Sequence, residues 1–243
     1  MSLRTPAFAD PEHAGVYLAH PQPTMADSIS MMKPVWVFDL DNTLHNAMPH
    51  IFPHINRSMT TYLQQHLEME EQEANNLRVH YWHRYGATLS GMMKHHGTDP
   101  DHFLWHTHQF PELSQMVLRI PMLRSMLNKL PGKKLLFSNA PHAYVRAVLR
   151  LLRIEDLFED VFAIEHAHYQ PKPQLAGFVK LLHKHRLSPS HCVMVEDSAE
   201  NLQVAKRLGM RTVWVDGSFR FPAYVDVKIR NVMELSRALP RLI

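Results

Sequence analysis

The feature that most constrains this chain is an apolar run that ends in two closely spaced carboxylates. Residues 35–38 read Val-Trp-Val-Phe, a composition rich in β-branched and aromatic side chains that predicts a buried strand. Asp39 and Asp41 follow, and residues two apart in an extended chain point to the same side. Like charges this close are costly unless a cation lies between them or one carboxyl keeps its proton. The pattern favours a metal-assisted site with a nucleophile and an acid-base residue, although Asp-Asn-Thr also suits an ordinary polar turn.

The rest of the chain mostly alternates between predicted strands and helices. Strands are expected at 134–137, 161–164, 192–195 and 212–215, and helices at 121–130, 143–152, 173–185 and 198–208. Such alternation predicts an α/β fold, with a doubly wound, Rossmann-like parallel sheet and helices on both faces. In these folds ligands bind at the carboxyl ends of the strands, where the polar residues of this chain fall.

One block interrupts the alternation. Residues 46–118 show apolar side chains at helical spacing and no strand signal, and Asp99 followed by Pro100 is typical of a helix start. We therefore expect an inserted α-helical cap domain at 46–118 and a Rossmann-like core at 33–45 and 119–243. Residues 1–32 hold four prolines and no sustained periodicity, so we expect a flexible N-terminal extension there.

Further polar residues follow the later strands, in a fixed order along the chain. They are Ser138 with Asn139, Lys172 between two prolines, and Glu196 with Asp197. With the Asp pair, this set resembles the four motifs of the haloacid dehalogenase superfamily of phosphohydrolases, over about residues 33–216. The resemblance implies a phosphatase of the Rossmann-like fold that works with Mg²⁺.

The resemblance also implies a role for each motif residue. Asp39 would attack phosphorus and form an aspartyl-phosphate, and Asp41 would protonate the departing alkoxide and later accept a proton from water. Dehalogenases of this superfamily lack the second Asp, so Asp41 argues against that activity. The carboxylates of Asp39 and Asp197, with the backbone carbonyl of Asp41, are the expected Mg²⁺ ligands.

The remaining motif residues are expected to bind phosphate or to support the site. Ser138, the backbone amides that follow it at Asn139, and the Lys172 cation are suited to hold phosphoryl oxygens. Glu196 is expected either to pair with Lys172 or to hold a metal-bound water. Asn201 is the last residue of a Glu-Asp-Ser-x-x-Asn sequence and is expected to support the site.

Three segments are similar to the pyrimidine 5′-nucleotidase branch of the superfamily: residues 39–44, 196–201 and 84–91. This similarity implies hydrolysis of UMP- or CMP-like nucleotides to nucleoside and phosphate. The expected substrate-binding residues are His45, Arg84, Tyr85 and Thr88. Arg84 would meet a phosphate or sugar hydroxyl and Tyr85 would stack on a base, although a surface Arg and a packing Tyr are equally ordinary. The chain departs from the branch at His45, where an aromatic such as Tyr is expected, and at Ala87, where Thr is expected.

Other functions stay open or are disfavoured by composition. The same motifs serve phosphoglycolate phosphatases, sugar phosphatases and phosphomutases, and a non-catalytic phosphoryl-ligand sensor or scaffold is a further alternative. A net charge of +3 from scattered basic residues does not favour a nucleic-acid polymer as partner. We expect a small phosphomonoester, a nucleoside monophosphate, as the ligand.

Cysteine usage and hydropathy bear on location. A single cysteine, Cys192, excludes an internal disulfide, and no run is long and apolar enough for a membrane span, so we expect a cytoplasmic protein. Among nineteen histidines, His102 and His106 lie one helical turn apart and offer a transition-metal pair, but solvated surface histidines are the favoured interpretation.

Overall fold

The computed structural model describes residues 33–242, so the extension expected at 1–32 lies outside the described residues. Six parallel strands form one sheet in the order β3-β2-β1-β4-β5-β6. The strands are β1 (Val35–Phe38), β2 (Lys134–Phe137), β3 (Asp160–Phe162), β4 (Cys192–Glu196), β5 (Arg211–Val215) and β6 (Val227–Ile229). The predicted α/β class with a parallel sheet is confirmed.

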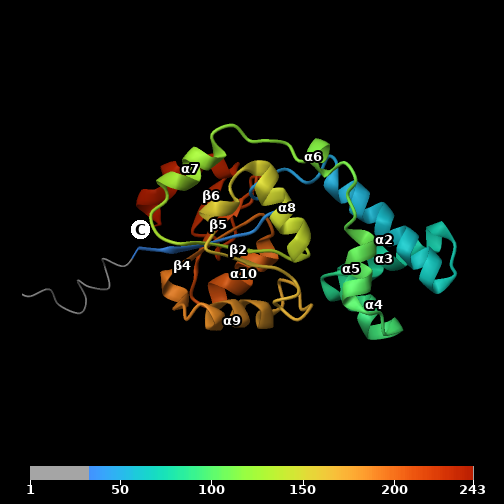
Figure 1. Cartoon of the computed structure of the whole chain (residues 1–243). Helices are drawn as coiled ribbons and strands as arrows, with labels where there is room; N and C mark the ends of the chain where they lie inside the picture. The colour runs from blue at the N-terminus through green and yellow to red at the C-terminus, as the bar shows by residue number, and fades with distance from the viewer. Residues whose placement is uncertain (1–32, 243) are drawn as a thin grey trace, which may run out of the picture. The chain divides into compact units, whose positions relative to one another are not determined.

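Helices cover both faces of this sheet because both faces of its strands are apolar. Trp36 and Phe38 of β1 lie in one buried cluster, whereas Val35 and Val37 lie in another. Helices α7 and α8 cover one face and α9 and α10 the other (Figure 1). Their bounds are α7 (Leu123–Lys129), α8 (His142–Leu152), α9 (Leu175–Lys184) and α10 (Ala199–Arg207), and the short α11 (Leu235–Ala238) adds Leu235 to the α7 and α8 side.

The register of the central strands decides which residues meet. Phe38 of β1 pairs with Leu136 of β2 and with Val195 of β4. Asp39 therefore lies level with the end of β2 on one side and with Glu196 on the other. Because all these strands run parallel, the polar residues that follow them gather at one edge of the sheet.

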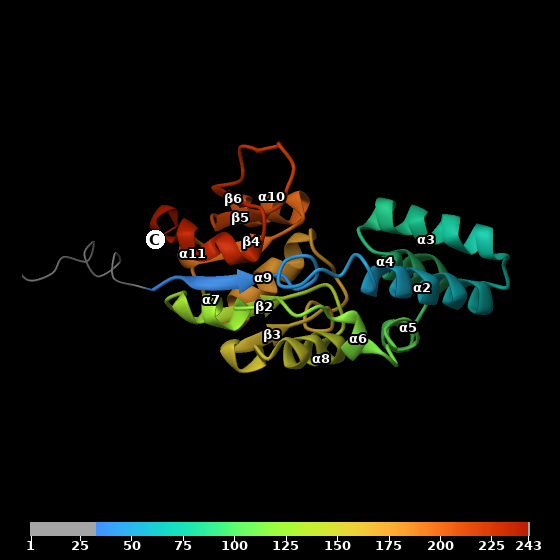
Figure 2. The same ribbon diagram turned by 90° about the horizontal axis from the view of Figure 1, so that it is seen from above.

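A block of helices lies between β1 and β2 in the sequence. It contains α2 (Ile51–Leu67), α3 (Glu71–Tyr85), α4 (Thr88–His96), α5 (Pro100–Thr107) and α6 (Leu113–Met116). Helices α2, α3 and α4 lie side by side (Figure 2), and they share a buried cluster that includes Leu63, Tyr81 and Phe103. Asp99 caps α5 by accepting a hydrogen bond from the His102 backbone N–H. The division of the chain at 46 and 118 stays a prediction.

Several elements differ from the sequence-based expectation. Strand β6 and helix α11 were not predicted, because each is short and carries little periodic signal. Helices α4 and α6 lie within the block that was expected to be helical. Helix α9 begins at Leu175, since Pro171 and Pro173 fall in the turn before it. Single-turn 3₁₀ helices lie at Glu155–Leu157, Pro189–His191, Val232–Glu234 and Leu239–Arg241. Within residues 33–242, no helix combines the length and apolar character needed to cross a bilayer.

Candidate active site

A tight turn after β1 presents the two aspartates. Asp39 follows the last residue of the strand, and its backbone N–H donates to Val195 O of β4 at 3.0 Å. Asn42 adopts a left-handed conformation with φ of 63°, which Asn tolerates better than most residues. The Asn42 side chain accepts a hydrogen bond from the Ala47 N–H at 3.1 Å and so fixes the turn. Asp41 lies within this turn, close to the strand ends.

Lys172 lies at the centre of the site. Its Nζ donates to Asp39 Oδ1 at 2.7 Å, to Glu196 Oε2 at 2.8 Å and to the Phe137 carbonyl at 2.7 Å. An ammonium group has three N–H donors, and all three are used here. The side chain is only 2% exposed, so Lys172 joins the ends of β1, β2 and β4 through buried hydrogen bonds.

Asn139 holds Lys172 in place. The Asn139 Oδ1 accepts from the Lys172 backbone N–H at 2.7 Å, and its Nδ2 donates to the Lys172 carbonyl at 3.0 Å. Both polar atoms of the Asn139 side chain are thus used in hydrogen bonds with the backbone of Lys172. The Asn139 backbone N–H makes no hydrogen bond among the described residues and is free to donate.

The carboxylates around Lys172 differ in their affinity for protons. Burial raises the pKa of Asp39 to about 7, with Glu196 adding to the effect and Lys172 opposing it. Burial also raises the pKa of Asp197, to about 9, and the charges of Asp39 and Glu196 act in the same direction. Burial by itself would raise the pKa of Glu196, but Lys172, the Asp197 side chain and the Ser198 backbone N–H together lower it. Burial by itself would lower the pKa of Lys172, but Asp39 and Glu196 raise it.

This cluster fits a divalent cation. One oxygen each from Asp39, Glu196 and Asp197 lie within 4.8 Å of one another. Oxygen ligands suit a hard cation such as Mg²⁺. A cation would also offset the neighbouring carboxylate charges that, after burial, raise the pKa values of Asp39 and Asp197. Glu196 Oε2 already pairs with Lys172, one of the two roles expected for Glu196, and its Oε1 accepts from the Asp197 and Ser198 N–H groups. Asp39 and Asp197 are therefore the main candidate ligands.

Ser138 and Asn201 lie at the same edge. Ser138 follows β2 and is buried, and its Oγ accepts from the Ala140 N–H at 3.1 Å, which leaves the hydroxyl proton free to donate. Asn201 is buried in the first turn of α10, where its N–H lies 3.4 Å from Oγ of the N-cap residue Ser198. Asn201 therefore helps to set the start of the helix that follows Asp197.

Asp41 has two side-chain partners, one of which the sequence did not indicate. Its Oδ1 lies 2.8 Å from His45 Nε2 and accepts from the Tyr144 hydroxyl of α8 at 2.7 Å. His45, expected to bind substrate, is instead buried beside Asp41. Burial and the Asp41 charge raise the pKa of Tyr144, so its hydroxyl stays a donor. Nothing in the sequence distinguishes Tyr144 from a packing residue of an amphipathic helix.

The expected cap residues lie in different surroundings. Thr88 is 4% exposed and its hydroxyl donates to the Arg78 carbonyl at 3.1 Å, a placement inside the helical block that argues against substrate contact. Arg84 is exposed. Tyr85 is half-buried, its hydroxyl lies 2.6 Å from His95 Nε2, and the Lys94 ammonium lies 5.0 Å from its ring centre.

This cap segment comes close to the loop that carries Lys172. A Cβ at Gly86, the residue after Tyr85, would lie 3.7 Å from Cδ of Pro173. The backbone of Gly86 therefore approaches the candidate active-site loop. The same loop also meets the cap through Tyr169, whose hydroxyl donates to Asp101 Oδ1 of α5 at 2.5 Å.

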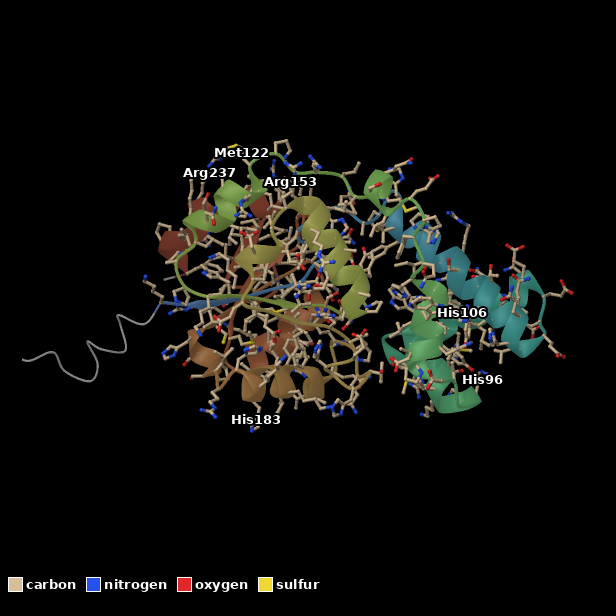
Figure 3. The ribbon with its side chains drawn as sticks, viewed as in Figure 1. His96, His106, Met122, Arg153, His183 and Arg237 are labelled. Atoms are coloured by element: carbon tan, nitrogen blue, oxygen red, sulfur yellow. The ribbon has the colours of Figure 1, made fainter. Side chains whose placement is uncertain are left out.

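The cap histidines do not form a metal centre as they stand. His106 lies on α5 and His96 at the end of α4 (Figure 3). The rings of His102 and His106 lie 4.4 Å apart between centres, and His66 lies 5.3 Å from His102. Within residues 33–242, only the group of Asp39, Glu196 and Asp197 brings three ligand atoms close enough to share an ion.

In a parallel α/β sheet the ligand site lies at the carboxyl ends of the strands, and here that edge holds several carboxylates and a buried lysine. Comparison with protein families places the chain in one of them. The model of the haloacid dehalogenase-like hydrolases matches residues 36–215, and the chain belongs to this family.

The chain is 26% identical over 195 residues to Phosphate metabolism protein 8 of Saccharomyces cerevisiae, and the match covers 72% of this chain. It spans 59% of the length of that yeast protein.

Solved structures show the same fold. A phosphatase of this family from Thermococcus onnurineus is similar with a TM-score of 0.62 at 22% identity, covering 86% of this chain and 98% of that one. L-2-haloacid dehalogenase from Xanthobacter autotrophicus has a TM-score of 0.56 at 14% identity, with coverage of 86% and 99%. A family hydrolase from Bacillus subtilis bound to magnesium has a TM-score of 0.55 at 15% identity, with coverage of 85% and 98%.

Proposed function

We propose that this protein is a Mg²⁺-dependent phosphomonoesterase that forms an aspartyl-phosphate on Asp39. The observation that carries the proposal is the buried Lys172, which pairs with Asp39 and Glu196 and lies beside Asp197. A structural salt bridge has no need for the additional carboxylates at the same strand ends. A site that transfers a dianionic phosphoryl group needs a nucleophile, a proton donor and positive charge, and all three are at hand.

In the first step, a carboxylate oxygen of Asp39 attacks phosphorus while the bond from phosphorus to the leaving oxygen breaks. The Lys172 ammonium holds Asp39 Oδ1 at 2.7 Å, which orients the carboxylate and directs its other oxygen to the reaction. Asp41 gives its proton to the leaving oxygen, so that an alcohol departs. The Ser138 hydroxyl and the Asn139 backbone N–H donate to phosphoryl oxygens and keep the group in line.

In the second step, water attacks the phosphorus of the aspartyl-phosphate and Asp41 accepts its proton. The bond to Asp39 breaks, phosphate leaves, and the starting carboxylate and the protonated Asp41 are restored. A Mg²⁺ ion held by Asp39 and Asp197 would stabilise negative charge on the phosphoryl oxygens as a Lewis acid.

The substrate class that we propose is a pyrimidine nucleoside monophosphate. The support lies in residues 84–86, because this segment approaches the loop of Lys172 and carries Arg84 and Tyr85. An aromatic ring can stack on a base, and a guanidinium can pair with an anionic or hydroxyl group. Similarity to a yeast protein named for phosphate metabolism is in keeping with a phosphate ester as substrate.

A substrate panel tests both levels of the proposal. Phosphate release would be measured with Mg²⁺ across UMP, CMP, dUMP, AMP, GMP, phosphoglycolate and several sugar phosphates, with a chelator control. We expect the highest kcat/KM for UMP or CMP and no turnover with chelator. A preference for phosphoglycolate or sugar phosphates would support a phosphatase but reject the nucleotidase assignment. Binding of these esters without phosphate release would favour a sensor.

The nucleophile is tested by Asp39→Asn with a matched control. We expect turnover to fall by at least about a thousandfold, because the amide cannot form the acyl phosphate. Asp156→Asn removes an exposed carboxylate that pairs with Arg124 and should leave turnover unchanged. Substantial activity in folded Asp39→Asn protein would refute the covalent mechanism.

A further inference from the structure

We infer that His45 and Tyr144 are positioning residues that occupy one oxygen of Asp41, Oδ1, and leave Oδ2 as the atom that carries the proton. The inference deepens the proposed function and rests on it. It assigns a role to two residues outside the expected catalytic set, one of them on α8.

The hydrogen bonds to Asp41 converge on a single atom. His45 Nε2 lies 2.8 Å from Oδ1, and the Tyr144 hydroxyl donates to the same Oδ1 at 2.7 Å. A carboxylate oxygen has two lone pairs in its plane, so two donors fill it. No hydrogen bond among residues 33–242 engages Oδ2. When Asp41 is protonated, the proton therefore sits on Oδ2.

The surroundings of His45 define which of its nitrogens donates. The side chain is buried, and its Nδ1 has no hydrogen-bond partner among the described residues. A proton on Nδ1 would be a buried N–H without an acceptor, which is more costly than an unused lone pair. The ring N–H is therefore on Nε2, and His45 donates to Asp41 Oδ1.

Tyr144 is held by packing as well as by its hydroxyl. It is 4% exposed, and its ring lies 5.1 Å from Phe110 and 6.0 Å from His108 between centres. These two residues belong to the segment that leads from α5 toward the core. A ring fixed in this way has few alternative rotamers, so its hydroxyl holds Asp41 at a defined angle.

This arrangement has a chemical consequence for both steps. As the leaving oxygen takes the proton from Oδ2, Asp41 becomes a carboxylate whose charge is stabilised by the two donors on Oδ1. In the second step the proton of the attacking water returns to Oδ2. The two donors never exchange protons with the substrate; they fix the plane of the carboxyl group and decide which oxygen faces the reaction.

The experiment measures how strongly catalysis depends on the leaving group. Tyr144→Phe and His45→Leu each remove one donor, and His45→Gln keeps an amide N–H in a similar place. The kcat/KM of each variant would be divided by that of the parent protein for an alkyl phosphate and for 4-nitrophenyl phosphate. Expulsion of an alkoxide needs a proton donor, whereas 4-nitrophenolate leaves with little help.

We expect Tyr144→Phe and His45→Leu to lose roughly 10-fold to 100-fold in kcat/KM on the alkyl phosphate and less than about threefold on 4-nitrophenyl phosphate. His45→Gln should recover most of the loss. The ratio between the two substrates does not depend on the fraction of folded enzyme, so partial misfolding does not obscure the result. Tyr62→Phe, which deletes a hydroxyl bonded to His102 in the cap, should leave the ratio unchanged.

Equal losses on both substrates, or no loss, in protein whose Asp39→Asn variant is inactive would overturn the inference and leave the proposed function standing. If the parent protein releases phosphate from no member of the substrate panel and from neither of these esters, the proposed function fails and this inference fails with it.

Discussion

At the scale of single residues, Lys172 has the most demanding position in the molecule. It lies between Asp39 and Glu196 with almost no access to water, and its positive charge is paired with both of these buried carboxylates. Moving one charge from water to such a place costs several kcal/mol, which attraction and hydrogen bonds must offset. Removal of the cation leaves two buried carboxylates facing each other.

We therefore expect Lys172→Met to lower the free energy of unfolding by about 3–5 kcal/mol, measured by urea denaturation. Lys133 provides the matched control, since it pairs with Glu159 at 2.8 Å while 62% of its side chain stays exposed. Lys133→Met should cost no more than about 1 kcal/mol, because water screens that pair. Similar costs for the two variants would show that the buried trio of Lys172, Asp39 and Glu196 is not a connected unit.

At the scale of elements, the contact between α3 and α4 depends on a glycine. A Cβ at Gly91 of α4 would lie 2.2 Å from Cγ of Tyr81 on α3, well inside van der Waals contact. Tyr81 is itself buried, so neither helix can move aside without opening the cluster that they share. Gly91, the last residue of the segment 84–91, thus has a packing role that is independent of substrate.

We expect Gly91→Ala to lower the free energy of unfolding by about 1–3 kcal/mol, because the added methyl group overpacks the contact with Tyr81. The higher helix propensity of Ala offsets part of this loss. Gly217→Ala is the control, because a Cβ at Gly217 would meet nothing within 4 Å. Thermal unfolding of both variants would be compared with that of the parent. A melting temperature for Gly91→Ala equal to that for Gly217→Ala would mean that the two helices are less tightly packed than described.

The loop before β6 is attached to strand β5 and helix α10 through Asp226. The Asp226 carboxylate accepts from the Thr212 N–H of β5 at 2.9 Å and pairs with Lys206 of α10. Burial by itself would raise the pKa of Asp226, but Lys206 and Thr212 hold it below its usual value of 3.8. One carboxylate thereby joins a helix, a strand and a loop.

The lowered pKa gives this contact a defined pH dependence. A carboxyl whose pKa is lower in the folded state contributes stability above its usual pKa of 3.8, and the contribution is lost as pH falls through the folded value. We expect Asp226→Asn to lower the free energy of unfolding by about 1 kcal/mol, a small cost because the pair with Lys206 is partly solvated. The cost should be the same at about pH 7 and at about pH 5. The difference in unfolding free energy between Asp226→Asn and the parent should shrink below pH 3.8. A cost that already disappears near pH 5 would contradict the assignment.

At the scale of the whole molecule, some features were predictable and others were not. The strand at 134–137 was predicted with the observed bounds, because fully buried parallel strands read as unbroken apolar runs. Strand β6 was missed because three residues at the edge of the sheet carry no such run. The polar residues were expected at the carboxyl ends of the strands because strands and helices alternate along the chain. The contact of Tyr144 with Asp41 spans 103 residues and depends on how α8 packs, which no local pattern encodes.

The acidic cluster gives a test that involves the stability of the entire chain. If Asp39 and Asp197 hold Mg²⁺ in the folded protein only, the ion must raise the melting temperature by mass action. At an ion concentration of about 100 times Kd, the gain is about 2.7 kcal/mol. For a chain of this size that corresponds to a shift of roughly 5–10 °C. The measurement is calorimetry with Mg²⁺ and with a chelator.

Asp197→Asn should remove most of the Mg²⁺-dependent shift, because one ligand oxygen is replaced by an amide nitrogen or a weaker carbonyl donor. The same variant should be at least as stable as the parent in chelator, since it removes a carboxyl whose ionised form is disfavoured by burial and by the charges of Asp39 and Glu196. Asp156→Asn should keep the full shift, because Asp156 lies on the surface and pairs with Arg124 instead. A shift that survives in Asp197→Asn would locate the ion elsewhere. A loss of stability in chelator would mean that Asp197 holds the strand ends together without any metal.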